Sequence, residues 1–279
     1  MNSLHTHPDF PSQYVPPRRV DVWLPPQYDA EENGRFPTLT MHDGQNLFTP
    51  EHAYGGVTWG VAEAVTRLSA AGEIAPVIII GIWNAGDLRW PEYLPERPFT
   101  TPAGQQQLVH IRAEFAEQSG TAVPAPHSDN YLRFLVQELK PFIDQTYRTR
   151  PEREATFIMG SSMGGLISLY ALCEYPDVFA GAGCLSTHWP AVKSAILPYL
   201  HDHLPAPGRH KLYFDYGTAG LDAAYEPHQL AVDALLQQRG YTSGQHWLTR
   251  QFPGADHNEA AWQARVYIPL TFLMGKGEG

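Results

Sequence analysis

The sequence contains very little cysteine and no long hydrophobic run, and each of these gaps excludes a class of protein. Cys173 and Cys184 are the only two cysteines in 279 residues. That is too few for a disulfide-stapled secreted scaffold, so we expect buried thiols. No stretch has about 18 uninterrupted apolar residues, and the N-terminal residues lack a basic start followed by an apolar segment. We therefore expect a cytoplasmic protein with no membrane-spanning segment.

Basic residues are also scarce. The chain has 19 Lys and Arg against 29 Asp and Glu, a formal net charge of −10, and its basic residues are scattered. Nucleic acid and anionic membranes bind clustered positive charge, so both are disfavoured as partners. No G-x-G-x-x-G opens a helix after a strand and no Walker motif occurs, so no nucleotide cofactor is implied. The His-Asp-His group at 201–203 lacks a further ligand at a recognisable spacing, so we expect no metal site.

Strand and helix patterns alternate along the chain, and no linker or repeat divides it. We expect a single domain over residues 1–279, because 43% of its residues are hydrophobic and can form one large core. The expected strands cover residues 18–25, 36–44, 75–83, 155–160, 179–186, 210–217 and 246–254, and the expected helices cover residues 58–73, 128–147, 163–176, 227–240 and 258–275. This alternation predicts an α/β three-layer sandwich, with a mostly parallel central sheet and helices on both faces.

Residues 84–127 interrupt the alternation. They are rich in proline, glycine and aromatic residues at first and weakly helical later, so we interpret them as an insertion that shapes a pocket. Active sites on parallel sheets lie at the carboxyl ends of the strands, where such an insertion would meet them. In the helix that follows, Pro141 should produce a kink.

The segment GSSMG, Gly160 to Gly164, matches G-x-S-x-G between an expected strand and an expected helix. This is the pattern of a nucleophile elbow, a sharp turn that exposes its central serine, here Ser162, while the flanking glycines avoid clashes. Ser161 competes with it but occupies the variable position of the motif, and Ser186 lacks any elbow. A structural glycine-serine turn is the alternative interpretation.

A serine hydroxyl needs a histidine to take its proton, and that histidine needs a carboxylate to fix its tautomer. In this architecture the order along the chain is serine, acid, histidine. His257 lies between the last expected strand and the last expected helix, so we predict that it is the base. Asp222 lies in the loop beyond the penultimate strand and is the predicted acid, with Asp215 inside that strand and Glu226 further on as the alternatives.

Acyl chemistry also needs donors for a developing oxyanion. In such folds these are the backbone N–H after the nucleophile and one from the loop after an early strand. Met163 provides the first. For the second we choose the N–H of Gln45 in the segment TMHDGQNLF, although a plain Asp-Gly turn is an alternative interpretation of that segment.

The segments MHDGQNLF, GSSMGGLISLYAL, FDYGTAGLD and GADHNEAAW together resemble the esterase D-like branch of the α/β-hydrolases, and the likeness extends over nearly the whole chain. That branch includes S-formylglutathione hydrolases, feruloyl and acetylxylan esterases, enterochelin esterases and mycolyltransferases. The resemblance implies an α/β-hydrolase fold with Ser162 as nucleophile, Asp222 as acid, His257 as base and oxyanion donors at Gln45 and Met163. It leaves the substrate open, because the branch acts on many kinds of ester.

The candidate substrate contacts are aromatic and charged residues of the insertion and of a later loop. They are Asp87, Arg89, Trp90, Tyr93 and Trp189. Aromatic rings beside a site can stack on a sugar or an aromatic acyl group, or they can simply pack the insertion, and the sequence does not separate the two.

These features predict a serine carboxylic ester hydrolase that forms an acyl-enzyme, takes a small-molecule ester and needs no cofactor. Acyl transfer to an alcohol other than water is a second hypothesis, because the same triad supports it when the pocket excludes water. A binding protein that kept the fold without its chemistry is a third. The sequence leaves the acyl group, the alcohol and the oligomeric state open.

Overall fold

A single mixed sheet forms the centre of the computed structural model, which describes residues 3–120 and 124–275. Within these residues the sheet has eight strands in the order β1-β2-β4-β3-β5-β6-β7-β8. The strands are β1 (Ser3–Phe10), β2 (Arg18–Leu24), β3 (Thr38–His42), β4 (Ile78–Ile82), β5 (Thr156–Ser161), β6 (Gly181–Leu185), β7 (Lys211–Gly217) and β8 (Trp247–Phe252). Strands β4, β3 and β5 to β8 are parallel, whereas β2 is antiparallel to β4 and to β1. The seven strands expected from the sequence are all present.

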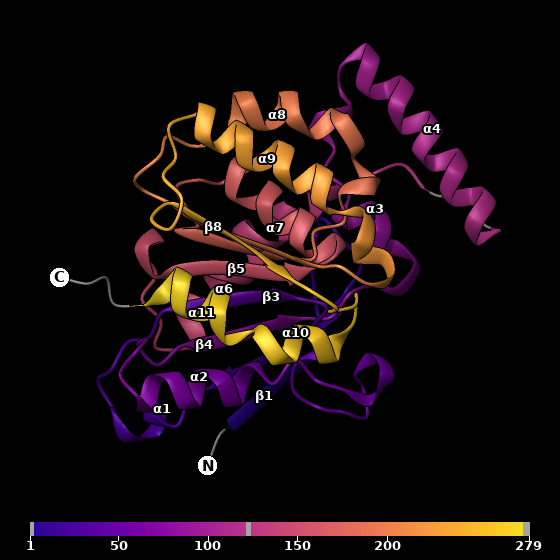
Figure 1. Cartoon of the computed structure of the whole chain (residues 1–279). Helices are drawn as coiled ribbons and strands as arrows, with labels where there is room; N and C mark the ends of the chain where they lie inside the picture. Colours follow the sequence, from indigo (N-terminus) through magenta and orange to yellow (C-terminus); the bar gives the residue numbers. More distant parts are fainter. Residues whose placement is uncertain (1–2, 121–123, 276–279) are drawn as a thin grey trace.

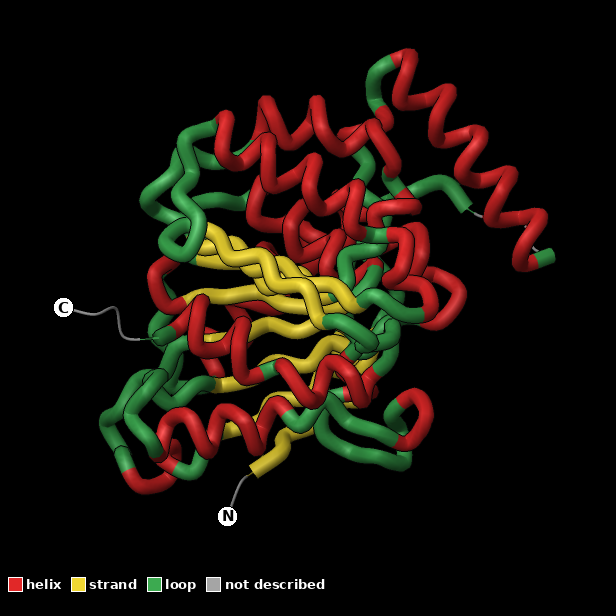
Figure 2. Tube along the Cα trace, viewed as in Figure 1, coloured by secondary structure: helices red, strands yellow, loops and turns green. Residues whose placement is uncertain are grey.

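Helices lie on both faces of this sheet (Figures 1 and 2). Their bounds are α1 (Gln27–Ala30), α2 (Val61–Ala70), α3 (Arg89–Tyr93), α4 (Pro102–Ser119), α5 (Ser128–Arg133), α6 (Lys140–Thr146), α7 (Met163–Glu174), α8 (Ile196–His203), α9 (Glu226–Gln238), α10 (Glu259–Arg265) and α11 (Tyr267–Met274). None of the helices in the described ranges is long and apolar enough to cross a membrane.

The apolar side chains of the sheet divide between two hydrophobic cores, one on each face. Along β4, Ile78, Ile80 and Ile82 belong to one core and Ile79 to the other, as the alternation of side chains along a strand requires. Helices α7, α8 and α9 contribute to the first core, and α2, α10 and α11 contribute to the second. The predicted three-layer α/β sandwich is therefore confirmed.

Helix α7 is the most deeply buried helix next to the sheet. Every residue from Met163 to Cys173 is buried, and the helix packs against β5 and β6. A helix that is apolar all round must lie inside the fold. Its buried position fixes the turn at its N-terminus, which holds the candidate nucleophile.

Strand β1 was not expected from the sequence. Its segment is polar, contains Pro8 and is mostly exposed, so it lacks the alternation that marks a half-buried strand. It pairs only with β2, at the edge of the sheet. Both cysteines, in contrast, are free and buried, as expected.

The helix expected at 128–147 is divided by a short π-helical segment. Helix α5 continues into this segment, Phe134–Leu139, which runs into α6. Pro141 follows two residues after the end of this segment. Because proline has no N–H to donate and its ring clashes with the carbonyl four residues earlier, the widened turn just before it is a way to keep the chain helical.

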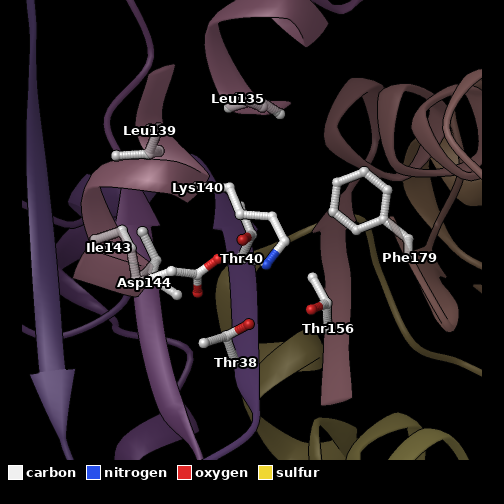
Figure 3. A pocket seen from close by; sticks show the side chains of 10 residues that line it. Thr38, Thr40, Leu135, Leu139, Lys140, Ile143, Asp144, Thr156 and Phe179 are labelled. Atoms are coloured by element: carbon white, nitrogen blue, oxygen red, sulfur yellow. Dashed lines mark hydrogen bonds and ion pairs between the residues drawn. The ribbon is translucent and has the colours of Figure 1, made fainter. Parts of the chain in front are cut away.

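A small cavity lies beside this π-helical segment, at the amino ends of the parallel strands. Figure 3 shows it between Leu135, Leu139 and Lys140 on one side and Thr38 and Thr156, the first residues of β3 and β5, on the other. Its volume is about 20 Å³, which is room for about one water molecule. It is too small for a substrate and lies at the wrong end of the sheet.

The insertion expected at 84–127 contains α3, α4 and short 3₁₀ turns. Its first part lies against the sheet and the candidate site, whereas α4 stands away from the sheet in Figure 1. Lys193 beyond β6 contacts this helix through an ion pair with Glu114, 2.7 Å between Nζ and Oε2. Residues 121–123 of the expected insertion lie outside the described residues.

Candidate active site

Ser162 occupies the turn between β5 and α7, with φ 57° and ψ −123°. A non-glycine residue rarely adopts a positive φ, so the backbone of Ser162 is strained and must be held in place by its surroundings. A Cβ on Gly160 would lie 2.7 Å from backbone atoms of Gly164, and a Cβ on Gly164 would lie 3.3 Å from the Cβ of His42. Gly160 is therefore required by close backbone approach, while Gly164 leaves only tight room beside the side chain of His42. The turn lifts Ser162 out of the strand.

His257 and Asp222 meet at this end of the sheet although 35 residues separate them. The Nδ1 atom of His257 lies 2.6 Å from Oδ1 of Asp222. The imidazole also makes edge contacts with the rings of Tyr225 and Trp262, at centroid distances of 5.8 and 5.1 Å. These contacts restrict the ring to one orientation, with Nδ1 on the carboxylate and Nε2 left for another partner.

The Asp222 carboxylate is fully buried and yet ionised. Burial alone would raise its pKa, but hydrogen bonds from His257, Ser186 and the N–H of Gly217 hold the pKa below its ordinary value. A carboxylate in this state can orient an imidazole and stabilise its protonated form. Asp215, the alternative acid, is committed elsewhere, because it forms a buried ion pair with Arg265.

Ser162 and His257 line one cleft of about 510 Å³. In the described residues the Ser162 hydroxyl has no hydrogen-bond partner, and the side chain of His257 is 13% exposed. Catalytic hydrogen bonds are often long in unliganded enzymes and shorten when substrate binds. The cleft thus brings together the serine and the histidine that were predicted from the sequence, and Asp222 lies directly behind the histidine.

Of the two predicted oxyanion donors, Met163 follows Ser162 directly and Gln45 lines the same cleft as Ser162. Met163 is the first residue of α7, so its N–H has no partner within the helix. Gln45 lines the cleft from a 3₁₀ turn, Gly44–Asn46, whose first N–H groups are likewise free of internal partners. A Cβ on Gly44 would lie 2.6 Å from the backbone of Gly81, so the Asp-Gly pair lets this turn lie tightly against β4.

Arg89, one of the candidate substrate contacts, lines the cleft but is already paired with Asp43. Its Nε and Nη2 atoms lie 2.7 and 2.8 Å from the two carboxylate oxygens, and Asn84 donates to the same carboxylate at 2.7 Å. Asp43 is buried and has φ 55°. Burial opposes ionisation, but Arg89 and Asn84 lower the pKa of Asp43. The pair therefore braces the turn that carries Gln45.

The other candidate substrate contacts do not reach the cleft. Tyr93 and Trp189 are 0% and 1% exposed, and both belong to the hydrophobic core. Trp90 is half-buried and packs on Phe115, with ring centroids 5.5 Å apart, while Asp87 lies exposed on a 3₁₀ turn. Of the two interpretations that the sequence left open for these aromatic residues, the structure supports packing.

Sequence reasoning missed several residues that do line the cleft: Asn46, His52, Tyr54, Asn84, Glu259 and Trp262. The Nδ2 atom of Asn46 donates to Oε1 of Glu259 at 3.3 Å, while its Oδ1 accepts from the N–H of Tyr54 at 3.0 Å. Asn46 thus joins the oxyanion-side turn to the segment after His257. Two of the missed residues could have been found from their proximity in sequence to predicted site residues, because Asn46 follows Gln45 and Glu259 lies two residues after His257.

Two histidines near the turn, His42 and His188, should make the fold sensitive to acid. Burial lowers the pKa of His42 to about 3 and that of His188 to about 4. Between these values and the ordinary 6.5, the unfolded chain binds protons that the folded protein does not, so stability falls as the pH drops. For His42, we expect a loss of about 2 kcal/mol between pH 7 and pH 5.

Urea unfolding of wild type and His42→Gln at both pH values measures this contribution. We expect the variant to lose less stability than wild type on going from pH 7 to pH 5, whatever its stability at pH 7. An equal loss in the two proteins would mean that His42 does not remain neutral in the fold.

Comparison with known proteins identifies the family. A family model described as "Putative esterase" matches residues 16–270. The chain belongs to this family. It is an esterase of the α/β-hydrolase fold, with a serine hydrolase among its structural neighbours.

Two relatives from Bacillus subtilis (strain 168) are similar in sequence. The uncharacterised protein YbbA is 24% identical over 265 residues, which cover 93% of each chain. Ferri-bacillibactin esterase BesA is 30% identical over 159 residues, which cover 55% of this chain and 49% of BesA.

Solved structures share the fold at lower identity. An IroE-like serine hydrolase from Shewanella oneidensis superposes with a TM-score of 0.71 at 18% identity, covering 97% of this chain and 79% of that one. A ferulic acid esterase superposes with a TM-score of 0.69 at 17% identity, covering 98% of both chains.

Proposed function

We propose that this esterase hydrolyses carboxylic esters through a triad of Ser162, His257 and Asp222, with an acyl-enzyme intermediate. The observation that carries the proposal is the 2.6 Å contact between Nδ1 of His257 and Oδ1 of Asp222, beside a strained serine that lines the same cleft as the histidine. A serine, a histidine and an acid arranged in this way support acyl transfer on many unrelated folds.

The chemistry proceeds in two halves. In the first, Oγ of Ser162 attacks the ester carbonyl carbon while Nε2 of His257 accepts the hydroxyl proton, and the negative oxygen of the tetrahedral intermediate accepts hydrogen bonds from the N–H groups of Gln45 and Met163. His257 then gives its proton to the departing alcohol. In the second half, water attacks the acyl-enzyme, His257 again accepts and returns a proton, and the acid is released.

A fluorophosphonate probe tests this assignment, because it reacts only with a serine that a neighbouring base has activated. We expect one equivalent of probe on Ser162, located by mass spectrometry of the digested protein. We also expect loss of p-nitrophenyl acetate hydrolysis in proportion to labelling. A folded protein that the probe leaves unlabelled would favour the non-catalytic binding protein instead.

The exposure of the cleft to solvent favours hydrolysis over acyl transfer to another alcohol. Tyr54, one of the residues that line it, is 78% exposed. Water therefore has access to the site, whereas acyl transfer to another alcohol requires that water be excluded.

For the substrate we propose an ester whose acyl group is aromatic. A ferulic acid esterase is among the structural neighbours, and the cleft offers the rings of Tyr54 and Trp262. Aromatic rings prefer offset or edge contacts with other rings, which add to the burial of apolar area. Arg89 and Gln45 lie in the same cleft and can donate hydrogen bonds to polar groups on such a ring.

If Tyr54 stacks on this acyl group, replacing it with alanine should raise KM for methyl ferulate about 3- to 10-fold. The effect on kcat should be small, because the ring binds ground state and transition state alike. Tyr267→Ala provides the matched control, since Tyr267 is also exposed, at 42%, but does not line this cleft. An unchanged KM for methyl ferulate in Tyr54→Ala would rule out stacking by this residue.

A further inference from the structure

Ser186 is a buried serine with an unusual backbone, and the esterase chemistry described above does not use it. It follows β6 directly, is 0% exposed and has φ 41°. Its N–H donates to the main-chain oxygen of Asp215 at 2.9 Å and to the side-chain Oδ1 of the same residue at 3.1 Å. A non-glycine residue in this region carries strain of about 1–3 kcal/mol, so its surroundings must hold it there.

The hydroxyl of Ser186 has three partners. It donates to Oδ2 of Asp222 at 2.6 Å and accepts from Nε1 of Trp262 at 3.0 Å and from Nη2 of Arg265 at 2.9 Å. Indole and guanidinium nitrogens only donate, so they occupy the two lone pairs of the hydroxyl oxygen. The single hydroxyl proton is thereby directed to Asp222 and to no other acceptor.

The hydrogen bond from Ser186 also determines which oxygen of the Asp222 carboxylate faces His257. Oδ2 of Asp222 accepts from Ser186 and from the N–H of Gly217 at 2.7 Å, which leaves Oδ1 to His257. With two donors on Oδ2, the carboxylate cannot rotate about its χ2 axis without losing both hydrogen bonds. Ser186 therefore helps to decide which oxygen meets the imidazole and at what angle.

Ser186 also connects the acid to the element that carries the base. Trp262 and Arg265 lie on α10, which begins two residues after His257, and the Trp262 ring contacts the imidazole. Arg265 is anchored by Asp215 on β7, with Nη2 2.9 Å from Oδ1. One buried hydroxyl thus joins the ends of β6 and β7 to the helix behind the histidine.

We propose that Ser186 is the positioning residue of the catalytic acid, and that its hydroxyl holds Asp222 in the orientation that presents Oδ1 to His257. This proposal rests on the triad proposed above. Ser186 touches neither substrate nor the reacting atoms, and its whole effect passes through Asp222.

Two variants separate the hydroxyl from the backbone. Ser186→Ala removes the hydroxyl and keeps the strained φ, whereas Ser186→Gly removes the hydroxyl and relieves the strain. We expect both to lower kcat for p-nitrophenyl acetate about 10- to 100-fold, the range seen when an orienting partner of a metal ligand is lost, with KM little changed. Ser69→Ala is the control, since the Ser69 hydroxyl bonds only to Thr66 O within α2.

The pH dependence of kcat/KM distinguishes a positioning role from a purely structural one, because a purely structural role would leave it unchanged. The ionisable groups around the hydroxyl are Asp222, Asp215, Arg265 and His257, and neither substitution alters them. Without the hydroxyl the Asp222 carboxylate can turn away from Nδ1 of His257, which weakens the interaction that favours the protonated imidazole. The acidic limb of kcat/KM should therefore move to lower pH in both variants.

Fluorophosphonate labelling keeps the two proposals distinguishable. If wild type is not labelled at Ser162, the triad itself fails. If wild type is labelled and active but the folded variants keep kcat within twofold and an unchanged acidic limb, only the role of Ser186 fails. Failure of both variants to fold, seen by urea unfolding, would assign Ser186 to stability and would also overturn the proposal.

Discussion

Ser162→Ala is expected to lower kcat by about a million-fold, the scale reported when the nucleophile of a triad is removed. The other triad members cannot compensate, because without the hydroxyl there is no nucleophile to form the acyl-enzyme. Stability should change little. The Ser162 hydroxyl has no hydrogen-bond partner within residues 3–120 and 124–275, and alanine is as strained at φ 57° as serine is.

The measurement is the steady-state rate with p-nitrophenyl acetate, together with urea unfolding to show that the variant folds. Ser69→Ala is again the matched control, because it removes a hydroxyl from α2, outside the cleft. Activity in Ser162→Ala within tenfold of wild type would show that a different residue performs the chemistry. The assignment of the elbow would then be wrong.

The architecture could be predicted from the sequence because its determinants are local. The apolar runs of β3, β4, β5 and β6 are covered on both faces and stand out from the polar loops around them. The glycines of GSSMG likewise reflect contacts within a few residues, since Gly160 packs against Gly164. Strand β1 could not be found, because an exposed edge strand needs no apolar pattern.

The roles of aromatic residues could not be predicted, because they depend on which surfaces meet in three dimensions. Tyr93 and Trp189 lie in segments with the composition expected of a binding loop. Inside the fold, however, Tyr93 packs against the ring of His42, and Trp189 donates a hydrogen bond to Gln229. Tyr54 comes from a segment that no motif marked. A sequence states that a ring is present in a loop, and only the packing decides whether that ring faces solvent.

The support of the acid also depends on tertiary contacts. Ser186 follows β6, Asp222 lies in the loop after β7, and Arg265 is the last residue of α10. The three residues share no local sequence pattern. The order of the proposed serine, acid and histidine along the chain could be predicted because this fold places each residue after a strand. No such rule exists for the hydroxyl of Ser186, so the role that we propose for it rests on its three hydrogen bonds.

Asp222→Asn is expected to lower kcat about 10,000-fold at neutral pH, the effect known for this change in a serine protease triad. The reason lies in the two donors that fix Oδ2. Because Ser186 and Gly217 both donate there, the amide oxygen must occupy that position, and the amide nitrogen must face Nδ1 of His257. Nδ1 then has to accept, so the proton moves to Nε2, and the imidazole can no longer take the proton of Ser162.

Steady-state kinetics and fluorophosphonate labelling should both show this loss, while urea unfolding shows a folded protein, since the amide fills the same space as the carboxylate. Asp177→Asn is the matched control, because Asp177 is exposed and precedes β6, whereas the triad residues follow the carboxyl ends of their strands. A rate for Asp222→Asn within tenfold of wild type would mean that another group orients His257, and Asp222 would lose its role as the acid.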